Sequence, residues 1–236
     1  MSSIRWPLLV RKTHKWLALF VGIQVVLWTV TGFYMVAVHI DYIHGDHLVH
    51  AKAPGSFDPG ALLPVDKALA AAPGATEITL VAPLGRPAWK ARTPEGDVLL
   101  DGRTGARLPA FTEGEIRQIA AGIYTGNPTV TSIKLLTDAP QEMASRKPPF
   151  WQVEYEGWAK PTLYISPTTG ELISRRHALW RVFDFAWMLH IMDYDERSNV
   201  NNPLLRIATW SAFAMAISGA WLLFWAFPRK KKKKAK

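Results

Sequence analysis

Two uninterrupted apolar stretches stand near the ends of the chain. The first runs from Leu17 to Val38 and the second from Ile207 to Phe227, and neither contains a charged residue. The first stretch makes ~33 Å of helix, which is enough to cross the hydrocarbon core of a bilayer. We therefore expect two transmembrane helices, over residues 17–39 and 204–227.

The second predicted span has a defined beginning. Asn202 is a suitable N-cap, and Pro203 follows at the first helical position. Ala212, Ala216 and Ala220 recur every fourth residue, a spacing that lets a neighbouring helix approach closely.

Polar residues share a face within each span. Gln24 and Thr31 are seven residues apart in the first, as are Ser211 and Ser218 in the second. We expect these side chains to bond the two helices to each other.

The region between the spans contains an approximate internal repeat, over about 62–110 and 113–175. Each copy begins with a helical pattern and continues with strand-like segments. Trp89 corresponds to Trp151, and Gly105 in "DGRTG" corresponds to Gly170 in "SPTTG", where glycine suits a turn between strands. Each copy therefore predicts one helix followed by about three antiparallel strands.

The positive charge lies outside the two spans. The tails, residues 1–16 and 228–236, carry +4 and +7 of the net charge of +9, so the remainder carries −2. This distribution indicates a membrane surface rather than nucleic acid as the partner. The positive-inside rule places both termini in the cytoplasm and residues 40–177 outside, in the periplasm of a Gram-negative cell. No small-residue cleavage site follows the first span, so we expect it to be an uncleaved helix in the inner membrane.

Several kinds of chemistry have no support in the sequence. The chain has no cysteine, which excludes disulfides, c-type haem attachment and iron–sulfur clusters. Hydrolase motifs, phosphate loops and nicotinamide or flavin fingerprints are also missing.

Residues 178–203 form a connector before the second span. The stretch from Ala178 to Met192 is apolar apart from Arg181, Asp184 and His190. These residues are too few to span a bilayer, so we expect an interfacial amphipathic helix. Arg181 and Asp184 are three residues apart and are expected to pair. His190 lies on the apolar side of this helix, and Asp193, one turn later, is expected to orient its imidazole.

Three histidines are candidate ligands for haem iron. His39 ends the first span and should lie level with the helix that carries His190, so the two imidazoles would supply both axial ligands of a haem b. His14, at the inner edge, would ligate a second haem in a dimer or with a partner subunit, or would simply snorkel to the interface. The alternative is that His190 caps or pairs with Asp193 or a backbone carbonyl and that His39 is an interfacial residue.

A second histidine group, His44, His47 and His50, has a spacing of three with acidic residues nearby. It would either bind a divalent metal or form a solvated loop. Gly45 argues against one regular helix that would align the three imidazoles.

The repeat, with its "W-x-V/A" strands and "T-G" turns, resembles the PepSY domain in tandem. The flanks resemble the PepSY-associated transmembrane family, whose matching motifs here are His14-x-Trp16-Leu17, Thr31-Gly32 and Leu189-His190. Ala18 replaces the glycine usual in the family, and two spans are fewer than in its larger members.

This resemblance implies an α+β membrane protein in which two transmembrane helices flank a tandem PepSY-like extracytoplasmic domain, each copy a helix plus an antiparallel sheet. It also implies haem-based transmembrane electron transfer, as a ferric reductase-like component that reduces ferric siderophore or another acceptor in iron uptake. The partners would be the lipid bilayer and a second copy or a redox subunit. The alternative is a membrane-anchored PepSY binding or inhibitory module for an envelope peptidase or other partner, without cofactor.

Overall fold

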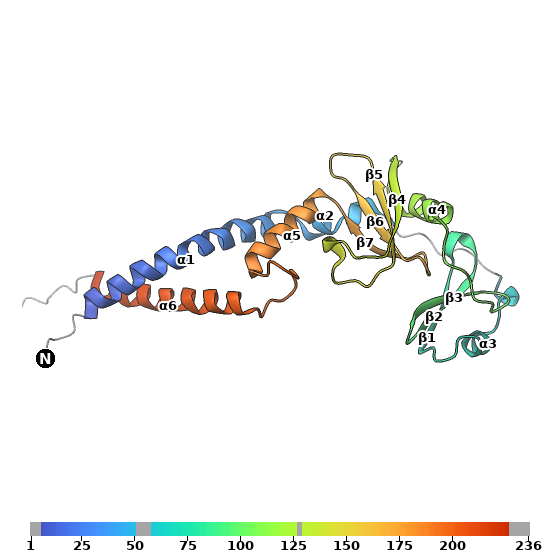
Figure 1. The fold of residues 1–236 in the computed structure, drawn as a ribbon, viewed down its shortest axis with the longest axis horizontal. Coiled ribbons are helices and arrows are strands. Elements are labelled where there is room, and N and C mark those ends of the chain that lie inside the picture. The colour runs from blue at the N-terminus through green and yellow to red at the C-terminus, as the bar shows by residue number, and fades with distance from the viewer. Residues whose placement is uncertain (1–5, 51–57, 127–128, 227–236) are drawn as a thin grey trace, which may run out of the picture. The chain divides into compact units, whose positions relative to one another are not determined.

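A computed structural model describes residues 6–50, 58–126 and 129–226. The chain divides into two compact units, labelled by element in Figure 1. The helical unit combines residues 1–38 with residues 183–236, and the sheet unit comprises residues 39–182. The predicted Lys-rich tail, 228–236, lies outside the described residues.

Three helices contribute to the helical unit. They are α1 (Trp6–Ala37), α6 (Pro203–Ala226) and the larger part of α5 (Ala178–Ile191). Two segments, Trp6–Ala37 and Pro203–Phe224, are long and apolar enough to cross a membrane, and hardly any of either is buried within the protein. Helices whose apolar surface is left uncovered by protein fit a lipid environment. The predicted architecture of two apolar helices flanking antiparallel sheets is confirmed.

One stripe of α1 is the exception to this exposure. A series of its buried and half-buried positions recurs in steps of three and four, which is the spacing of a helix–helix seam. This series is Pro7, Val10, His14, Leu17, Val21, Gln24, Trp28, Thr31 and Met35. Polar side chains therefore occupy the seam at both ends of α1, and Gln24 and Thr31 share a face as predicted.

The seam of α6 packs against α1 and follows the same spacing. Its half-buried positions include Ala212, Met215 and Gly219. Of the alanines predicted to allow close approach, Ala212 lies in the seam, whereas Ala216 and Ala220 are exposed. The other small residues at half-buried positions of α6 are Ala208, Ser211 and Ser218, so small residues do line the seam, but not through the predicted repeat of three alanines.

The beginning of α6 is as predicted. Asn202 Oδ1 accepts from the backbone N–H of Leu205 at 2.8 Å, and Pro203 is the first helical residue. The Asn202 amide also donates to the carbonyls of Ile191 and Asn199. One buried side chain therefore caps α6 and bonds the end of α5.

The sheet unit contains two copies of a helix followed by antiparallel strands. Short helical segments precede and connect them: α2 (Ile40–His44), η1 (Asp46–Leu48), η2 (Pro59–Ala61), η3 (Pro83–Gly85) and η4 (Gln141–Met143). The first copy comprises α3 (Val65–Ala70), β1 (Glu77–Val81), β2 (Ala88–Thr93) and β3 (Gly96–Asp101). The second comprises α4 (Glu113–Ile123), β4 (Val130–Leu136), β5 (Phe150–Tyr155), β6 (Thr162–Ile165) and β7 (Leu172–Arg176).

The two copies differ by one strand. Their sheets have the orders β1-β2-β3 and β4-β5-β6-β7. The expectation of about three strands is right for the first copy, and the second has a fourth. In the second copy the chain after the "T-G" turn pairs as β7, whereas in the first copy the matching chain makes only the bridge between Leu100 and Arg107.

The turns at Gly105 and Gly170, predicted to correspond, make the same hydrogen bonds. Gly105 N–H bonds the carbonyl of Asp101, and Gly170 N–H bonds the carbonyl of Ser166. Both glycines have positive φ, 75° and 69°. In each turn the first side chain, Asp101 or Ser166, accepts from the N–H groups two and three residues later. The same turn chemistry therefore closes both copies.

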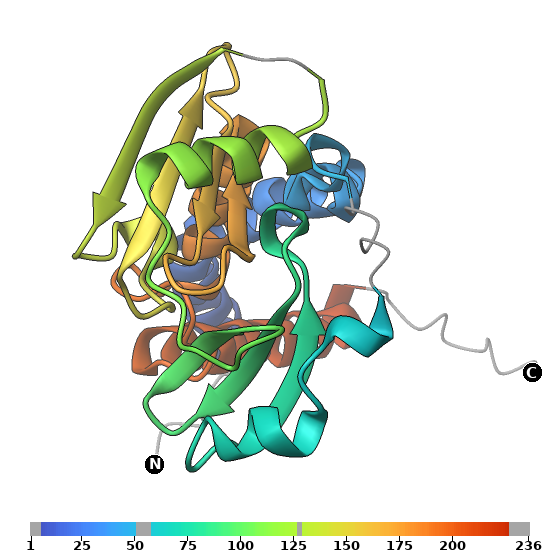
Figure 2. The same ribbon diagram turned by 90° about the vertical axis from the view of Figure 1, so that its right-hand side faces the viewer.

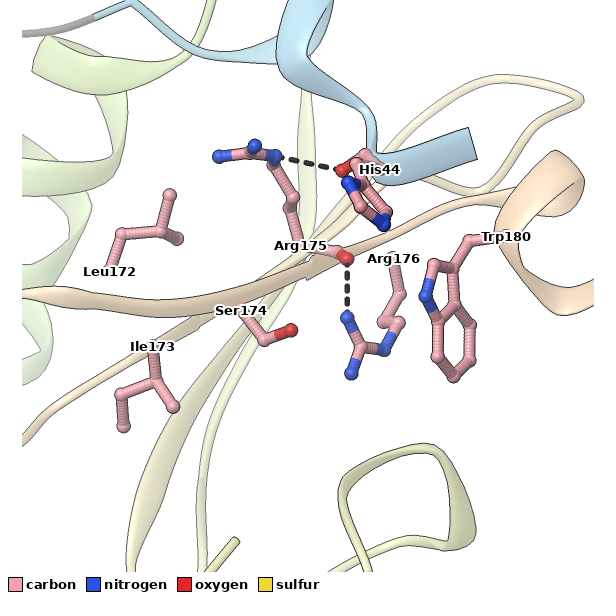
Figure 3. Close-up of a pocket in the computed structure, with 7 residues that line it drawn as sticks. All are labelled: His44, Leu172, Ile173, Ser174, Arg175, Arg176 and Trp180. Atoms are coloured by element: carbon pink, nitrogen blue, oxygen red, sulfur yellow. Dashed lines mark hydrogen bonds between the residues drawn. The ribbon is translucent and has the colours of Figure 1, made fainter. Parts of the chain in front are cut away.

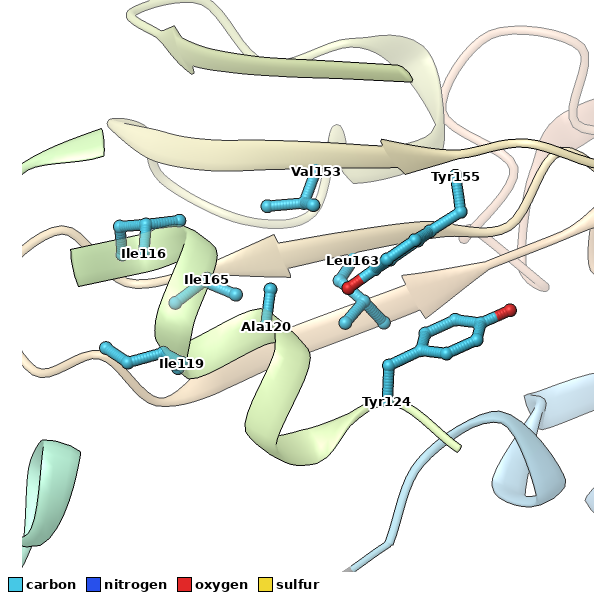
Figure 4. Packing of buried hydrophobic residues seen from close by; sticks show 8 residues of the cluster. All are labelled: Ile116, Ile119, Ala120, Tyr124, Val153, Tyr155, Leu163 and Ile165. Atoms are coloured by element: carbon cyan, nitrogen blue, oxygen red, sulfur yellow. The ribbon is translucent and has the colours of Figure 1, made fainter. Parts of the chain in front are cut away.

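The larger core lies between α4 and the second sheet. In Figure 2, α4 crosses one face of this sheet. Figure 4 shows Ile116, Ile119 and Ala120 of α4 pointing toward Val153 and Leu163 of the strands. A capping box formed by Thr112 and Glu115 begins the helix. Its apolar face then fixes the sheet against it.

The matched tryptophans belong to the two cores. Trp89 packs against the core of the first sheet and Trp151 against that of the second. The indole Nε1 of both is buried without a hydrogen-bond partner in the described chain. Both tryptophans are therefore core residues of their copies.

We expect Gly170→Ala to destabilise the protein by about 1–3 kcal/mol. The new methyl group would lie 2.8 Å from Ile119 Cδ1, at a positive φ. Gly114→Ala in α4 is the matched control, because its methyl group meets nothing within 4 Å. The free energy of unfolding of the full chain in detergent, from urea titration, measures both. Equal stability of the two variants would contradict the packing of this turn.

Candidate functional site: two histidines of the helical unit

His190 lies near the end of α5 and bonds α1. Its Nδ1 is 2.9 Å from Oγ1 of Thr31, a side chain that is only 5% exposed. The imidazole is half-buried. In the described part of the chain, its Nε2 has no hydrogen-bond partner.

The backbone around His190 is bonded to the same seam. The last carbonyls of a helix lack intrahelical partners, and lipid offers none. Gln24 Nε2 donates to the carbonyl of Leu189 at 3.2 Å, and Trp28 Nε1 donates to that of His190 at 2.7 Å. With Asn202 on the carbonyl of Ile191 at 2.8 Å, three successive carbonyls are satisfied, and the end of α5 is held against α1.

His14 makes the corresponding contact near the other end of the seam. Its Nδ1 is 2.8 Å from Oγ of Ser218 on α6. The ring is half-buried, and among the described residues nothing bonds its Nε2. Thr31 follows His14 by 17 residues, so the two imidazole sites are separated by about 26 Å along α1.

Each imidazole also lies against a glycine next to its hydroxyl partner. A Cβ atom at Gly32 would be 3.6 Å from Cε1 of His190, and one at Gly219 would be 3.1 Å from Cε1 of His14. The Thr31-Gly32 and Ser218-Gly219 steps therefore offer the same surface: a hydroxyl for Nδ1 and a bare backbone for the ring edge. The contact at Gly219 is the tighter of the two.

His39, the third predicted ligand, belongs to the sheet unit. It is the N-cap of α2, where its Nδ1 accepts from the backbone N–H of Asp41 at 3.4 Å. Its side chain is 68% exposed. His39 therefore has a capping role that was not predicted from the sequence. Its pairing with His190 on one haem stays a prediction, since the two histidines belong to different units.

The remaining histidine group does not converge. Gly45, at φ 73°, ends α2 and separates His44 from His47, as expected of a glycine there. His44, His47 and His50 line three different cavities. Among the described residues, no group of three His, Cys, Asp or Glu side chains is arranged to hold a metal ion.

One of these cavities, of about 230 Å³, is rich in cationic side chains (Figure 3). Arg175 donates from Nε to the carbonyl of His44 and pairs with Asp46. The Arg176 guanidinium lies 3.7 Å from the ring centroid of Trp180 and donates to the carbonyls of Glu142 and Arg175. These bonds attach β7 to the neighbouring segments, so a structural role accounts for both arginines of the cavity.

Two contacts predicted around His190 are wrong. Arg181 pairs with Glu142, at 2.8 Å, and Asp184 pairs with Arg197, so Arg181 and Asp184 do not bond each other. Arg181 also donates to the carbonyl of Lys160, and these partners outcompete a neighbour on the same helix face.

Asp193 does not orient the imidazole of His190, because its oxygens are already used. One accepts from the N–H groups of Asp195 and Glu196, and the other from those of Ser198 and Asn199. These bonds, that from Asn199 first, hold the pKa of the Asp193 carboxyl below its ordinary value. The Asp193 carboxylate organises the turn between α5 and α6. The predicted contact of Asp193 with the His190 imidazole is made by Thr31 instead.

The sequence predicted that Gln24 and Thr31 would bond the second span, whereas both bond α5. Ser218 does bond the other span, through His14, and neither hydroxyl was connected to a histidine. The heptad spacing that relates His14 to Val21 and Trp28, and Gln24 to Thr31, was available in the sequence. The matching Ser218-Gly219 step was a second available signal.

The fold and these contacts define a membrane-anchored α+β protein in which imidazoles lie in a helix–helix seam. Residues 11–236 match the family model described as "PepSY-associated TM region". Because this match covers nearly the whole chain, the protein belongs to the PepSY-associated transmembrane family. No curated protein and no solved structure shows a significant match.

Acidification should loosen the turn after α5. The depressed pKa means that Asp193 stabilises the folded turn above the unfolded-state pKa of about 4, and that this contribution is lost as the pH falls through the folded-state value. Asp193→Asn should remove it at every pH, because an amide nitrogen would then face backbone donors. Hydrogen exchange of residues 193–202 measures both effects. The control is Asp195→Asn, at an exposed side chain; equally fast exchange in both variants would contradict this account.

Proposed function

We propose that this protein carries electrons across the bacterial inner membrane through haem b, with His190 and His14 as ligands of two separate haems. The observation that carries the proposal is the shared state of the two imidazoles: Nδ1 bonded to a helix hydroxyl, Nε2 without a partner in the described chain. Membership of the PepSY-associated transmembrane family supports it.

The residues present fit such a group. A haem bound through imidazole needs no cysteine, and an oriented Nδ1 is the usual companion of metal ligation through Nε2. Haem b would supply a reversible one-electron couple. The chain's own residues orient the two rings and set them about 26 Å apart along α1. The second axial ligands would come from another copy, from a redox subunit or, for His190, from His39 as predicted.

The direction of transfer follows from charge. Arg11, Lys12 and Lys15 lie on exposed positions of α1 around His14, and the positive-inside rule puts this end in the cytoplasm. His14 would then serve the inner side and His190 the outer side. The acceptor would be a ferric siderophore or another periplasmic oxidant, reached by way of the PepSY-like sheets.

One observation favours the second function, a membrane-anchored binding module. Trp158, in the connection between β5 and β6, is 84% exposed. Exposed tryptophan is unusual, and this side chain is a frequent anchor in protein interfaces. A partner that covers Trp158 is compatible with either function, so the cofactor decides between them.

Absorbance of protein purified from membranes of haem-replete cells tests the proposal. We expect a Soret band that shifts on reduction, with part of the haem lost in His190→Ala and part in His14→Ala, because each histidine serves its own haem. His50→Ala, at an exposed side chain of the sheet unit, is the control and should keep the spectrum. His39→Ala reports on the predicted pairing: loss of the same haem as in His190→Ala would support it.

A folded, colourless protein from the same cells would contradict haem binding. It would leave the PepSY sheets as a binding module anchored by two helices.

A further inference from the structure

The hydroxyl partners of the two histidines have already used their only proton. A Ser or Thr hydroxyl has one hydrogen to donate and can otherwise only accept. Ser218 Oγ donates to the carbonyl of Met215 at 2.8 Å. Thr31 Oγ1 donates to the carbonyl of Leu27 at 2.7 Å, with a longer contact of 3.4 Å to that of Trp28. Both hydroxyls are therefore bonded back to their own helix.

This allocation determines which imidazole nitrogen is protonated. Toward His14 and His190, the Ser218 and Thr31 oxygens can only accept, so Nδ1 of each ring must carry the hydrogen. In a neutral imidazole the other nitrogen, Nε2, then has the lone pair. Nε2 is also the atom of each ring that has no partner in the described chain.

His39 lacks such a partner. Its Nδ1 accepts from the backbone N–H of Asp41, and a backbone N–H can only donate. The same Nδ1 also lies 3.4 Å from the Asp41 carboxylate, which favours a hydrogen on Nδ1, and the side chain is 68% exposed, so His39 is not held in one tautomer. As a ligand, His39 would first have to release its cap on α2, whereas His14 and His190 already present a lone pair.

We infer that Thr31 and Ser218 are positioning residues that hold His190 and His14 in the Nδ1–H tautomer, so that each presents its Nε2 lone pair to an incoming metal centre. The identity of that centre, haem iron, rests on the proposed function. The tautomers themselves are a property of this chain alone. Gly32 and Gly219 complete each position, because the ring edge that carries Cε1 lies against them.

Nitrogen NMR of the full chain in lipid nanodiscs, labelled with ¹⁵N-histidine and prepared without haem, tests the inference directly. At about pH 9, above the ordinary imidazole pKa of ~6.5, two-bond ¹H–¹⁵N spectra distinguish a protonated from an unprotonated ring nitrogen. We expect protonated Nδ1 and unprotonated Nε2 for His14 and His190, and a mixture of the two tautomers for the exposed His39.

Single substitutions separate a positioning role from a packing role. Thr31→Val keeps the shape but should release only His190 into a mixture with the Nε2–H form, and Ser218→Ala should do so only for His14. Thr31→Ser should restore the tautomer. Thr29→Val is the matched control, because Thr29 Oγ1 donates to the carbonyl of Val25 in the same way and is exposed.

Nε2–H signals from His14 and His190 in the unmodified protein would overturn the inference, as would unchanged signals in Thr31→Val and Ser218→Ala. If haem binds, Thr31→Val should weaken its affinity by roughly 10–100-fold. If the tautomers are as expected and haem does not bind, the proposed function fails and the positioning role stands.

Discussion

The helical unit depends on one constraint: inside a bilayer every polar group must find its partner within the protein. The end of α5 would leave carbonyls unpaired in an apolar environment. Gln24, Trp28 and Asn202 bond three of them in succession. Because two of these donors belong to the α1 seam, satisfying the backbone of α5 also determines where His190 lies, and Thr31 is then within reach of its ring.

The hydrogen bonds of the two hydroxyls also determine which nitrogen of each imidazole is protonated. Thr31 and Ser218 sit inside helices, where a hydroxyl commonly bonds the preceding turn. Because its hydrogen is used in this bond, each oxygen can only accept a hydrogen bond from the neighbouring histidine. An ordinary feature of helices therefore selects the Nδ1–H tautomer. The sheet unit contains a contrasting case, the exposed His39, which caps the N-terminus of α2 and has no hydroxyl partner that would fix its tautomer.

Local patterns predicted the features that depend on neighbouring residues. Residues close together in the sequence determine the apolar runs, the cap at Asn202 and the paired turns at Gly105 and Gly170. The spacing of Arg181 and Asp184 also suggested a local pair, but Glu142, 39 residues away from Arg181, offers two carboxylate oxygens in a fixed position. That competition depends on the folded sheet and could not be read from helix spacing.

The contacts of His14 and His190 were not predicted from the sequence, for a related reason. The sequence supplied His14 and His190 as candidates, and Asp193 as the orienting group by its spacing. The turn after α5 needs acceptors for its own N–H groups, and Asp193 provides them to four residues. The hydroxyls that actually bond the imidazoles come from the facing helices, and only the register of α1 against α5 and α6 identifies them.

Cross-linking of cysteine pairs measures that register most directly, because the chain has no cysteine of its own. Thr31→Cys with His190→Cys, and His14→Cys with Ser218→Cys, should each join within one chain on treatment with a short thiol cross-linker in membranes. The exchanged pairs, Thr31→Cys with Ser218→Cys and His14→Cys with His190→Cys, should not, because they lie at opposite ends of the seam. Cross-linking of the exchanged pairs within one chain as readily as the first two would contradict the account.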